Sequence, residues 1–456
     1  MITYQDWERM RSDLPGAVAT VISRHRTSPA TRIALDADRY DRQRNTTIGN
    51  YVRWLYLNDG KRVEDTTSMA HRLASNFFNR LNTQRMTYSL GNGVTFDVDG
   101  IKEQLGESFD TELRTAGYYA LIHGVSFMFW NVDRAYVFPL TEFAPIWDEE
   151  TGALRAGIRY WRVDPEKPVV AILYEEDGYT RFRSDRDGAA YTKVEDKRPY
   201  RVRMMQAPAD AVPEVVGEEN YGTVPIVPVY GSRLHQSTLV GLRAQIDAYD
   251  LIRSGYADDL AECSEIYWIV SNAGGMDDRD LQKFLKRLKR NHIANIENAD
   301  EVGITPYTQE VPYASRQAFL ADIRSGIYED FGGLDVHAIA AGATNDHIEA
   351  AYQPLDENAD DYEYQIIEAV QQLLALIGLP PATPLFKRNR ISNEAERTNM
   401  VLSAATYLDD RTILEKLPFV TPDEVEGILA SRDDEDMARF SAEVTPDAEV
   451  SMAPEL

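Results

Sequence analysis

The chain has 456 residues, more than the roughly 250–300 at which a single hydrophobic core stops growing, so we expect two or more domains. With 43% hydrophobic and 27% charged residues, the composition is that of a globular protein and argues against disorder of the whole chain. A formal net charge of −26 argues against tight, non-specific binding of nucleic acid by the whole surface, because acidic segments repel phosphate.

Membrane and disulfide signals are weak in this sequence. The stretch MITYQDWERM has no apolar core, so we expect no signal peptide. No apolar run approaches the roughly 18 residues that span a bilayer, so we expect no membrane partner. The single cysteine, Cys263, excludes a disulfide within the chain and favours a cytosolic fold.

The N-terminal part of the chain is basic and favours helices. Between Thr20 and Leu90 it carries 12 Lys and Arg against 6 Asp and Glu. The stretches NYVRWLYL and SMAHRLASNFFNRL have apolar residues at helical spacing, which predicts helices over 50–57 and 68–81. Met86, Tyr88 and Leu90 then alternate before a Gly-Asn-Gly turn, so a short strand is expected there.

A β-rich region follows from Val125 to about Val229. Short aromatic or β-branched runs such as FMFWNV, AGIRYWRV and PVVAILYEE are separated by the turn sequences DEETG, DPEKP and EEDG. This pattern predicts an α+β fold with an antiparallel, meander-like sheet. The β pattern ends at VPIVPVYGS, where Pro225 and Pro228 close it.

Two long helices flank a compact insertion. The first, in segment 233–264, has a narrow apolar stripe running from Leu239 to Leu260, which is typical of a helix that packs against other helices. The insertion, 265–312, contains a predicted strand at IYWIV and an extended stretch at 302–307. The second helix, over 313–331, ends at Phe331-Gly332-Gly333.

The insertion also contains a basic helix, KFLKRLKR. Its cations lie on one face by helical spacing: Lys283, Lys286, Arg287 and Arg290. A solvated surface face, a protein-binding face and a DNA-facing patch all fit this pattern.

A small, apolar, glycine-containing loop leads into the next long helix. Between Ala338 and Thr344 the chain carries no charge and no bulky residue except Ile339. The residues of this loop are Ala338, Ile339, Ala340, Ala341, Gly342, Ala343, Thr344 and Asn345. A helix is expected from His347 towards Ile377, with a kink or interruption at Pro354. Two or three short helices are predicted in 392–432, and 433–456 is an acidic tail that we expect to be mobile.

The sequence contains no motif that indicates a catalytic mechanism. The sequence has no Walker A motif and no HExxH pair, and Gly124-Val125-Ser126 lacks the second glycine of a nucleophile elbow because Met128 stands there. One cysteine cannot form a zinc site of four thiolates. We therefore expect no catalytic residues, no metal site, no cofactor and no enzymatic activity.

The order of these elements resembles the phage portal proteins of the family typified by the portal of phage SPP1. The likeness runs from about Ile48 to Phe440. It is carried by VPIVPVYGS leading into QIDAYDLIRSGYADDLAE, by DVHAIAAGATNDHIEAAYQPLDENADDYE and by FKRNRISNEAERTNM.

The resemblance implies a multidomain portal fold and a ring of subunits, typically a dodecamer, at one capsid vertex. Double-stranded DNA would be packaged through the ring by terminase and later ejected, held loosely and without sequence specificity. Further implied partners are the head–tail adaptor and the major capsid and scaffolding proteins, with assembly in the host cytoplasm and a final location in the virion. The implied parts are listed by residue: wing 1–232, first stem helix 233–264, clip 265–312, second stem helix 313–331, tunnel loop and long wing helix 332–378, helical crown 379–432 and tail 433–456.

The resemblance also assigns roles to the two candidate sites. Residues 338–345 would form the tunnel loop that faces the DNA channel. The basic face of the clip would contact terminase, a neighbouring subunit or DNA. A cellular oligomeric scaffold, or a hydrolase seated in residues 85–232, remains an alternative.

Overall fold

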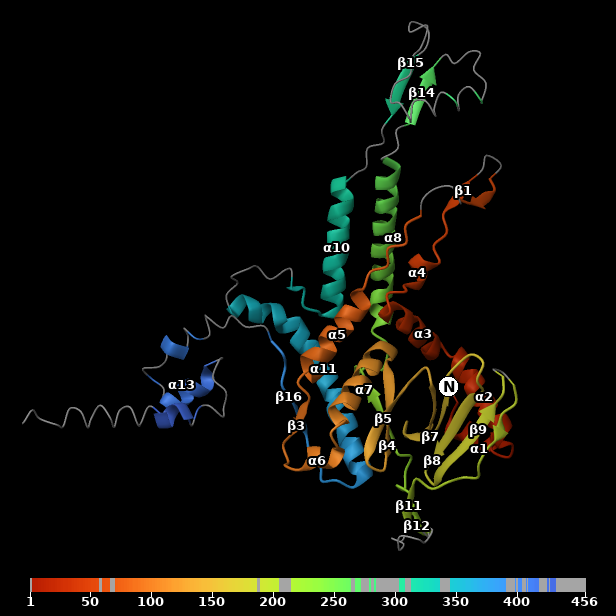
Figure 1. Ribbon diagram of the computed structural model, residues 1–456, viewed down its shortest axis with the longest axis vertical. Coiled ribbons are helices and arrows are strands. Elements are labelled where there is room, and N and C mark those ends of the chain that lie inside the picture. Colours follow the sequence, from red (N-terminus) through yellow and green to blue (C-terminus); the bar gives the residue numbers. More distant parts are fainter. Residues whose placement is uncertain are drawn as a thin grey trace, which may run out of the picture. The chain divides into compact units, whose positions relative to one another are not determined.

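The computed structural model divides the chain into two compact units. The first comprises Met1–Gly333 and Glu357–Arg388, and the second Leu334–Asp356 and Asn389–Leu456. The structure describes residues 2–56, 60–65, 70–186, 189–204, 215–263, 267–271, 279, 283, 303–307, 313–336, 345–390, 398, 401–403, 407, 409–417, 425 and 427–431. Figure 1 shows the elements of both units.

Capping residues explain where the N-terminal helices begin. Asp13 accepts a hydrogen bond from the Gly16 N–H at the start of α2 (Leu14–Thr27), and Ser28 accepts one from the Thr31 N–H at the start of α3 (Pro29–Asp41). Both helices also carry a proline in the first turn, where its missing N–H has no helical partner to lose. The other helices of this part are α1 (Tyr4–Met10), α4 (Thr46–Gly49), α5 (Phe77–Leu90), α6 (Ile101–Leu105) and α7 (Phe109–His123).

Two antiparallel sheets form the β-rich part of the first unit, which confirms the predicted meander. One has the order β10-β9-β8-β7-β6 and the other the order β13-β4-β5. The strands of the first are β6 (Phe143–Trp147), β7 (Leu154–Trp161), β8 (Val169–Glu175), β9 (Gly178–Ser184) and β10 (Thr192–Lys193). Those of the second are β4 (Val125–Asn131), β5 (Arg134–Pro139) and β13 (Ile226–Tyr230).

Three buried clusters hold these layers together. Helices α1 and α2 cover one face of the larger sheet around Trp7 and Phe182. An aromatic cluster that includes Phe127, Phe138 and Tyr174 joins the two sheets. Helix α7 packs between the smaller sheet and α11 (Asn345–Ile377), with Tyr362 fully buried between them.

Small two-stranded sheets complete the described architecture. Each pair is antiparallel. They are β1 (Trp54–Tyr56) with β2 (Arg62–Glu64), β3 (Val94–Phe96) with β16 (Pro384–Phe386), β11 (Arg201–Met204) with β12 (Val215–Glu219), and β14 (Tyr267–Ser271) with β15 (Gly303–Tyr307). The pairing of β14 with β15 confirms the two extended stretches expected at the ends of the insertion.

One local prediction is wrong, and the structure refines two others. The alternation of Met86, Tyr88 and Leu90 does not mark a strand, because α5 continues to Leu90 and buries the last two of these side chains. The β pattern ends within VPIVPVYGS, as predicted, because β13 ends at Tyr230. Pro228 lies inside this strand, which is an edge strand where a missing N–H is tolerated. Helix α11 contains Pro354, so of the kink or interruption expected there, only the interruption is excluded.

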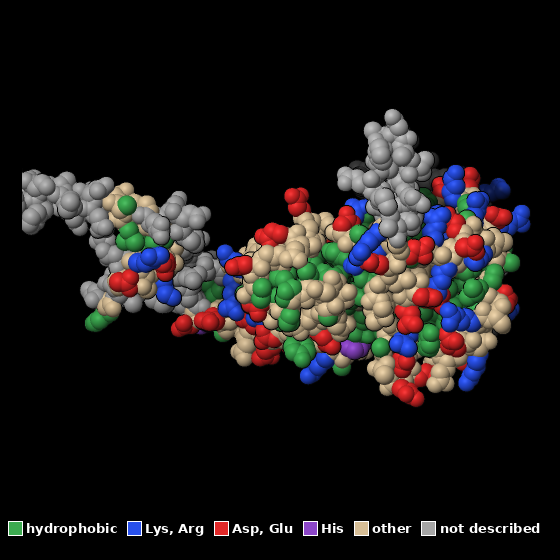
Figure 2. Space-filling view, turned by 90° about the horizontal axis from the view of Figure 1, so that it is seen from below, with side chains coloured by type: hydrophobic (Ala, Val, Ile, Leu, Met, Phe, Trp, Pro, Cys, Tyr) green, Lys and Arg blue, Asp and Glu red, His purple; other side chains and the backbone are tan. Residues whose placement is uncertain are grey.

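The described surface mixes charges of both signs. Figure 2 shows Lys and Arg side chains interspersed with Asp and Glu over the larger body on this face, rather than one continuous basic field. Among the described helices, none is long and apolar enough to cross a membrane.

Candidate functional site

Helices α8 (Leu239–Cys263) and α10 (Tyr313–Phe331) form a long antiparallel pair (Figure 1). The Gln245 side chain near the start of α8 donates to Asp330 near the end of α10, and Arg316 pairs with Asp259 at the other end. The rings of Tyr256 and Tyr313 lie 6.1 Å apart between the same helices. The structure thus confirms the two long helices that the sequence predicts on either side of the insertion.

This pair is buried at its base and exposed along its length. Leu242 and Ile246 of α8 pack with Ile327 and Phe331 of α10 in a cluster that also takes in Phe77 of α5. Farther along, Leu260, Tyr313 and Phe319 are exposed, and Phe319 has a relative accessibility of 50%. The apolar stripe expected on α8 is therefore only partly covered within the described chain.

A buried polar stripe on α8 holds a second segment of the chain in extended form. The N–H of Ser75 donates to Asp250 (2.8 Å), that of Leu73 to Ser254 (2.9 Å) and that of His71 to Asp258 (2.7 Å). All three acceptors are buried. We call these three hydrogen bonds the ladder.

The ladder works because two backbone periods nearly coincide. An extended chain advances about 6.6–6.8 Å in two residues, and an α-helix advances about 6.0 Å in four. Every second N–H from His71 to Ser75 therefore meets every fourth side chain from Asp258 back to Asp250. Since a buried N–H needs a partner, the ladder replaces the helix that the apolar spacing of 68–81 predicts, and α5 starts only at Phe77.

The base of the ladder is a dense group of polar contacts. Asp250 also accepts from the side chain of Asn45, and burial raises the pKa of its carboxyl group. Asp247, one turn earlier, accepts from Tyr40 and Thr47. Burial, and then the bond to Asp247, raises the pKa of the Tyr40 hydroxyl. These groups fix residues 40–47 against the start of α8.

The C-terminal end of α10 is capped by two other helices. Arg85 of α5 donates to the Phe331 carbonyl (2.9 Å), and Asn358 of α11 donates to the same oxygen (2.8 Å). The Arg85 guanidinium also lies 4.3 Å from the centre of the Phe331 ring. Burial lowers the pKa of Arg85 to about 10. A cation at a helix C-terminus interacts favourably with the helix dipole, so this cap stabilises the C-terminal end of α10.

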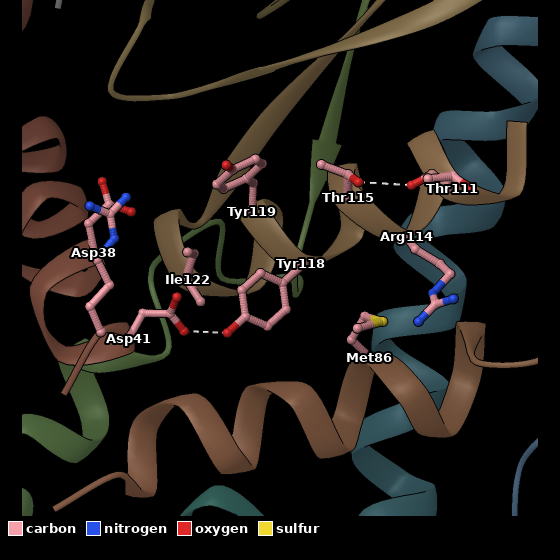
Figure 3. A pocket seen from close by; sticks show the side chains of 10 residues that line it. Asp38, Asp41, Met86, Thr111, Arg114, Thr115, Tyr118, Tyr119 and Ile122 are labelled. Carbon is pink, nitrogen blue, oxygen red and sulfur yellow. Dashed lines mark hydrogen bonds between the residues drawn. The ribbon is translucent and has the colours of Figure 1, made fainter. Parts of the chain in front are cut away.

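A cavity of about 470 Å³ lies among α3, α5 and α7 (Figure 3). Its two carboxylates are engaged: Tyr118 and Asn79 donate to Asp41, and Asp38 lies 2.8 Å from the buried ring of His123. Burial raises the pKa of the Tyr118 hydroxyl. One oxygen of each carboxylate is therefore held by a neighbouring side chain.

Little of the sequence-predicted site falls on described residues. Lys283 is helical and exposed, whereas Lys286, Arg287 and Arg290 lie outside the part that the structure describes. Ala338–Thr344 also lie outside it, and Asn345 is the first residue of α11. Among the described residues, no group of three or more His, Cys, Asp or Glu is placed to hold a metal ion.

The sequence did not point to the ladder. Its signal is an Asp, a Ser and an Asp four residues apart on a long helix, together with a preceding stretch whose apolar residues have helical spacing. A polar stripe of this kind is normally assigned to solvent, and only the fold shows that it is buried.

The two sheets, the α8–α10 pair and the insertion between its helices define a mixed helix-and-strand protein built around a projecting helix pair. A family model described as "Phage portal protein, SPP1 Gp6-like" matches residues 21–438. The chain belongs to this family, as the sequence resemblance indicated.

Two relatives that are named portal proteins are distant from this chain in sequence. The portal protein of Clostridium phage phiCD119 is 24% identical, over 78% of this chain and 83% of that protein. The portal protein of Bacillus phage SPP1 is 23% identical, over 85% of this chain and 80% of that protein.

Solved structures with a similar chain come from the necks of GTA particles. One, from the empty particle with C6 symmetry, is 9% identical with a TM-score of 0.42 and covers 74% of this chain and 88% of that chain. Another, from the native particle with C12 symmetry, is 12% identical with the same TM-score and covers 75% and 88%.

Proposed function

We propose that this chain is the portal subunit of a tailed double-stranded DNA phage and forms a ring around a channel at one capsid vertex. DNA is packaged through the channel by terminase and later ejected through it. The observation that carries the proposal is the α8–α10 pair, whose distal apolar residues, including Phe319, are exposed in the single chain. A ring repeats one heterologous contact between neighbours and would cover them.

The proposed parts follow the resemblance. Helices α8 and α10 act as the stem, 265–312 as the clip that meets terminase and then the head–tail adaptor, and 338–345 as the tunnel loop. Residues 1–232 form the wing and 379–432 the crown. The capsid and scaffolding proteins are proposed as partners of the assembled ring, a dodecamer.

The charge of the chain suits a conduit. Each phosphate that a protein neutralises releases counterions and adds affinity, so a strongly basic channel would retain DNA. Exposed acids stand on α10 at Asp322, Glu329 and Asp330, and Asp346 and Glu349 follow at the start of α11. We infer that DNA passes through loosely and that the protein carries no enzymatic activity of its own.

Imaging of the purified protein tests the proposal. Particles in the electron microscope should show a disc with a central hole. The measured mass should be a whole-number multiple of the 51.7 kDa mass of the chain. A protein that stays monomeric at all salt and protein concentrations would contradict it. A cellular scaffold would also form oligomers, so neighbouring terminase and capsid genes separate these two functions.

The two candidate sites have their own tests. Replacing Lys283, Lys286, Arg287 and Arg290 by Gln should leave ring assembly intact and impair packaging; unchanged packaging would reduce these cations to a solvated face. Replacing Gly342 by Val should disturb DNA passage more than folding, because a β-branched residue stiffens the loop. Loss of folding would instead show that the loop assignment is wrong.

A further inference from the structure

Residues 50–56 and 60–65, which contain the paired strands β1 and β2, form a feature that we call the arm. Strands β1 and β2 pair in the register Trp54–Glu64, Leu55–Val63 and Tyr56–Arg62. The N–H of Asp65 donates to the carbonyl of Arg53 (2.9 Å) and closes the base of the hairpin. In Figure 1 the arm lies away from the two sheets, beyond α4. Two strands alone are marginally stable in water, so such a hairpin needs further contacts to be well ordered.

The arm presents apolar side chains to solvent on both of its faces. Trp54 and Val63 have relative accessibilities of 42% and 49%, and their positions in the register put them on opposite faces. The Arg62 guanidinium lies 4.7 Å from the centre of a Trp54 ring. Tyr51, at the foot of the arm, is exposed as well. Exposed aromatic residues beside an arginine are typical of protein-binding surfaces.

The arm is held at a fixed place on α8 rather than hanging from a free linker. The chain that leaves it enters the ladder at His71, and the Arg72 side chain donates to the Tyr51 carbonyl (3.1 Å) between the two feet of the arm. Because both ends of the arm are fixed, the arm loses less conformational entropy when it binds a partner. The ladder therefore positions the arm for a partner.

We propose that the arm docks onto a second copy of this chain. The proposal rests on the ring of the proposed function, in which every α8–α10 pair has a neighbour on each side. A heterologous contact joins two different patches, which should be complementary. The arm is anchored on α8, and the α8–α10 pair leaves Leu260 and Phe319 exposed, so a neighbour that covers this pair would also meet the exposed side chains of the arm.

The charges of the arm do not favour DNA as the occupant. Arg53, Lys61 and Arg62 are adjacent to Glu64 and Asp65, and this mixture is a poor phosphate site. A surface that carries charges of both signs beside an aromatic residue fits a protein partner. The protein face in Figure 2 also carries charges of both signs.

Site-specific photo-cross-linking tests the proposal. The full chain is made with p-benzoylphenylalanine at position 63, in a mixture of copies that carry two different affinity tags, and is irradiated after its size is measured. The matched control carries the same residue at position 163, where Val163 is 83% exposed on the β7–β8 connection. We expect a product containing both tags from position 63 and at least about tenfold less from position 163.

The outcomes distinguish a failure of the arm proposal from a failure of the proposed ring. Rings with cross-links only within one chain, or with none from position 63, overturn the arm proposal and leave the portal function standing. A monomeric sample without two-tag product overturns both. Cross-links that appear only when DNA is added, and only to DNA, contradict the choice of a second copy.

A double variant gives a second measurement. Trp54→Ser with Val63→Ser should lower ring yield at fixed protein concentration by about tenfold or more, because a buried Trp is a common hot spot. The melting temperature of the monomer should stay unchanged, since both side chains are exposed there. Unchanged ring yield would overturn the proposal.

Discussion

Asp250 is a buried carboxyl group whose pKa is raised above its ordinary value of 3.8 by burial. The folded chain therefore holds this proton more tightly than the unfolded chain does, so stability falls as the pH rises through the window above about pH 4. Asp250→Asn removes the titration. We expect the unfolding free energy of the wild type, minus that of this variant, to decrease between about pH 4 and pH 7.

Urea unfolding of both proteins over that pH range measures the difference directly. A difference that stays flat or increases with pH would show that the hydrogen bonds from Asn45 and Ser75 outweigh burial.

Ser254 carries the middle hydrogen bond of the ladder. Ser254→Ala removes the acceptor of the half-buried N–H of Leu73, so we expect a loss of about 0.5–1.5 kcal/mol in unfolding free energy. The matched control is Ser325→Ala on α10, where an exposed hydroxyl donates to Glu329 and a change within about 0.5 kcal/mol is expected. Equal effects in chemical denaturation would argue against the ladder as a stabilising feature.

Helices and strands with one clear spacing of apolar residues were predictable from the sequence. Segments whose conformation depends on a distant contact were not. The spacing from Leu239 onward and the extent of α10 followed from the sequence alone, as did most strands of the larger sheet. The stretch 70–76 was predicted as helix because Leu73 and Phe77 have helical spacing, but α8, nearly 200 residues later, takes its backbone N–H groups. The arm was missed for a different reason, since the apolar spacing of NYVRWLYL favours a helix although Tyr56 pairs locally with Arg62. Local propensity cannot report such partners.

The packing of α7 on α11 gives a prediction at the scale of elements. A Cβ at Gly117 would lie 2.0 Å from the Tyr362 hydroxyl oxygen, which is buried without a hydrogen-bond partner among the described residues. Gly117→Ala should therefore lower the unfolding free energy by about 1–3 kcal/mol through overpacking.

The second substitution identifies the clashing atom. Tyr362→Phe removes only that hydroxyl, so the double variant should recover part of the loss, and Tyr362→Phe alone should be neutral or stabilising. Thermal or urea unfolding of the four proteins closes the cycle. Strictly additive effects would show that Gly117→Ala destabilises the protein through a contact other than the Tyr362 hydroxyl.

At the scale of the whole molecule, the family was accessible from the sequence because several segments kept their order and type: the entry into α8, the loop before α11 and the FKRNRISNEAERTNM stretch. The roles of 338–345 and of the basic face around Lys283 depend on neighbours in an assembly, and they stay predictions. A single chain can show only which surfaces are exposed, and α10 leaves Tyr313 and Phe319 of its distal half exposed to solvent.

Phe319 connects that open surface to assembly. It is 50% exposed in the middle of α10, so Phe319→Gln should change the unfolding free energy of the monomer by no more than about 0.5 kcal/mol. If the stem of a neighbouring copy covers it, the same substitution should lower ring yield by about tenfold, as the loss of a buried aromatic contact does. Val163→Gln, a substitution of another exposed apolar residue far from the helix pair in sequence, should leave ring yield unchanged. Rings formed at wild-type yield by Phe319→Gln would place this face of α10 away from the contact between subunits, and would direct the search to Tyr313 and Leu260 instead.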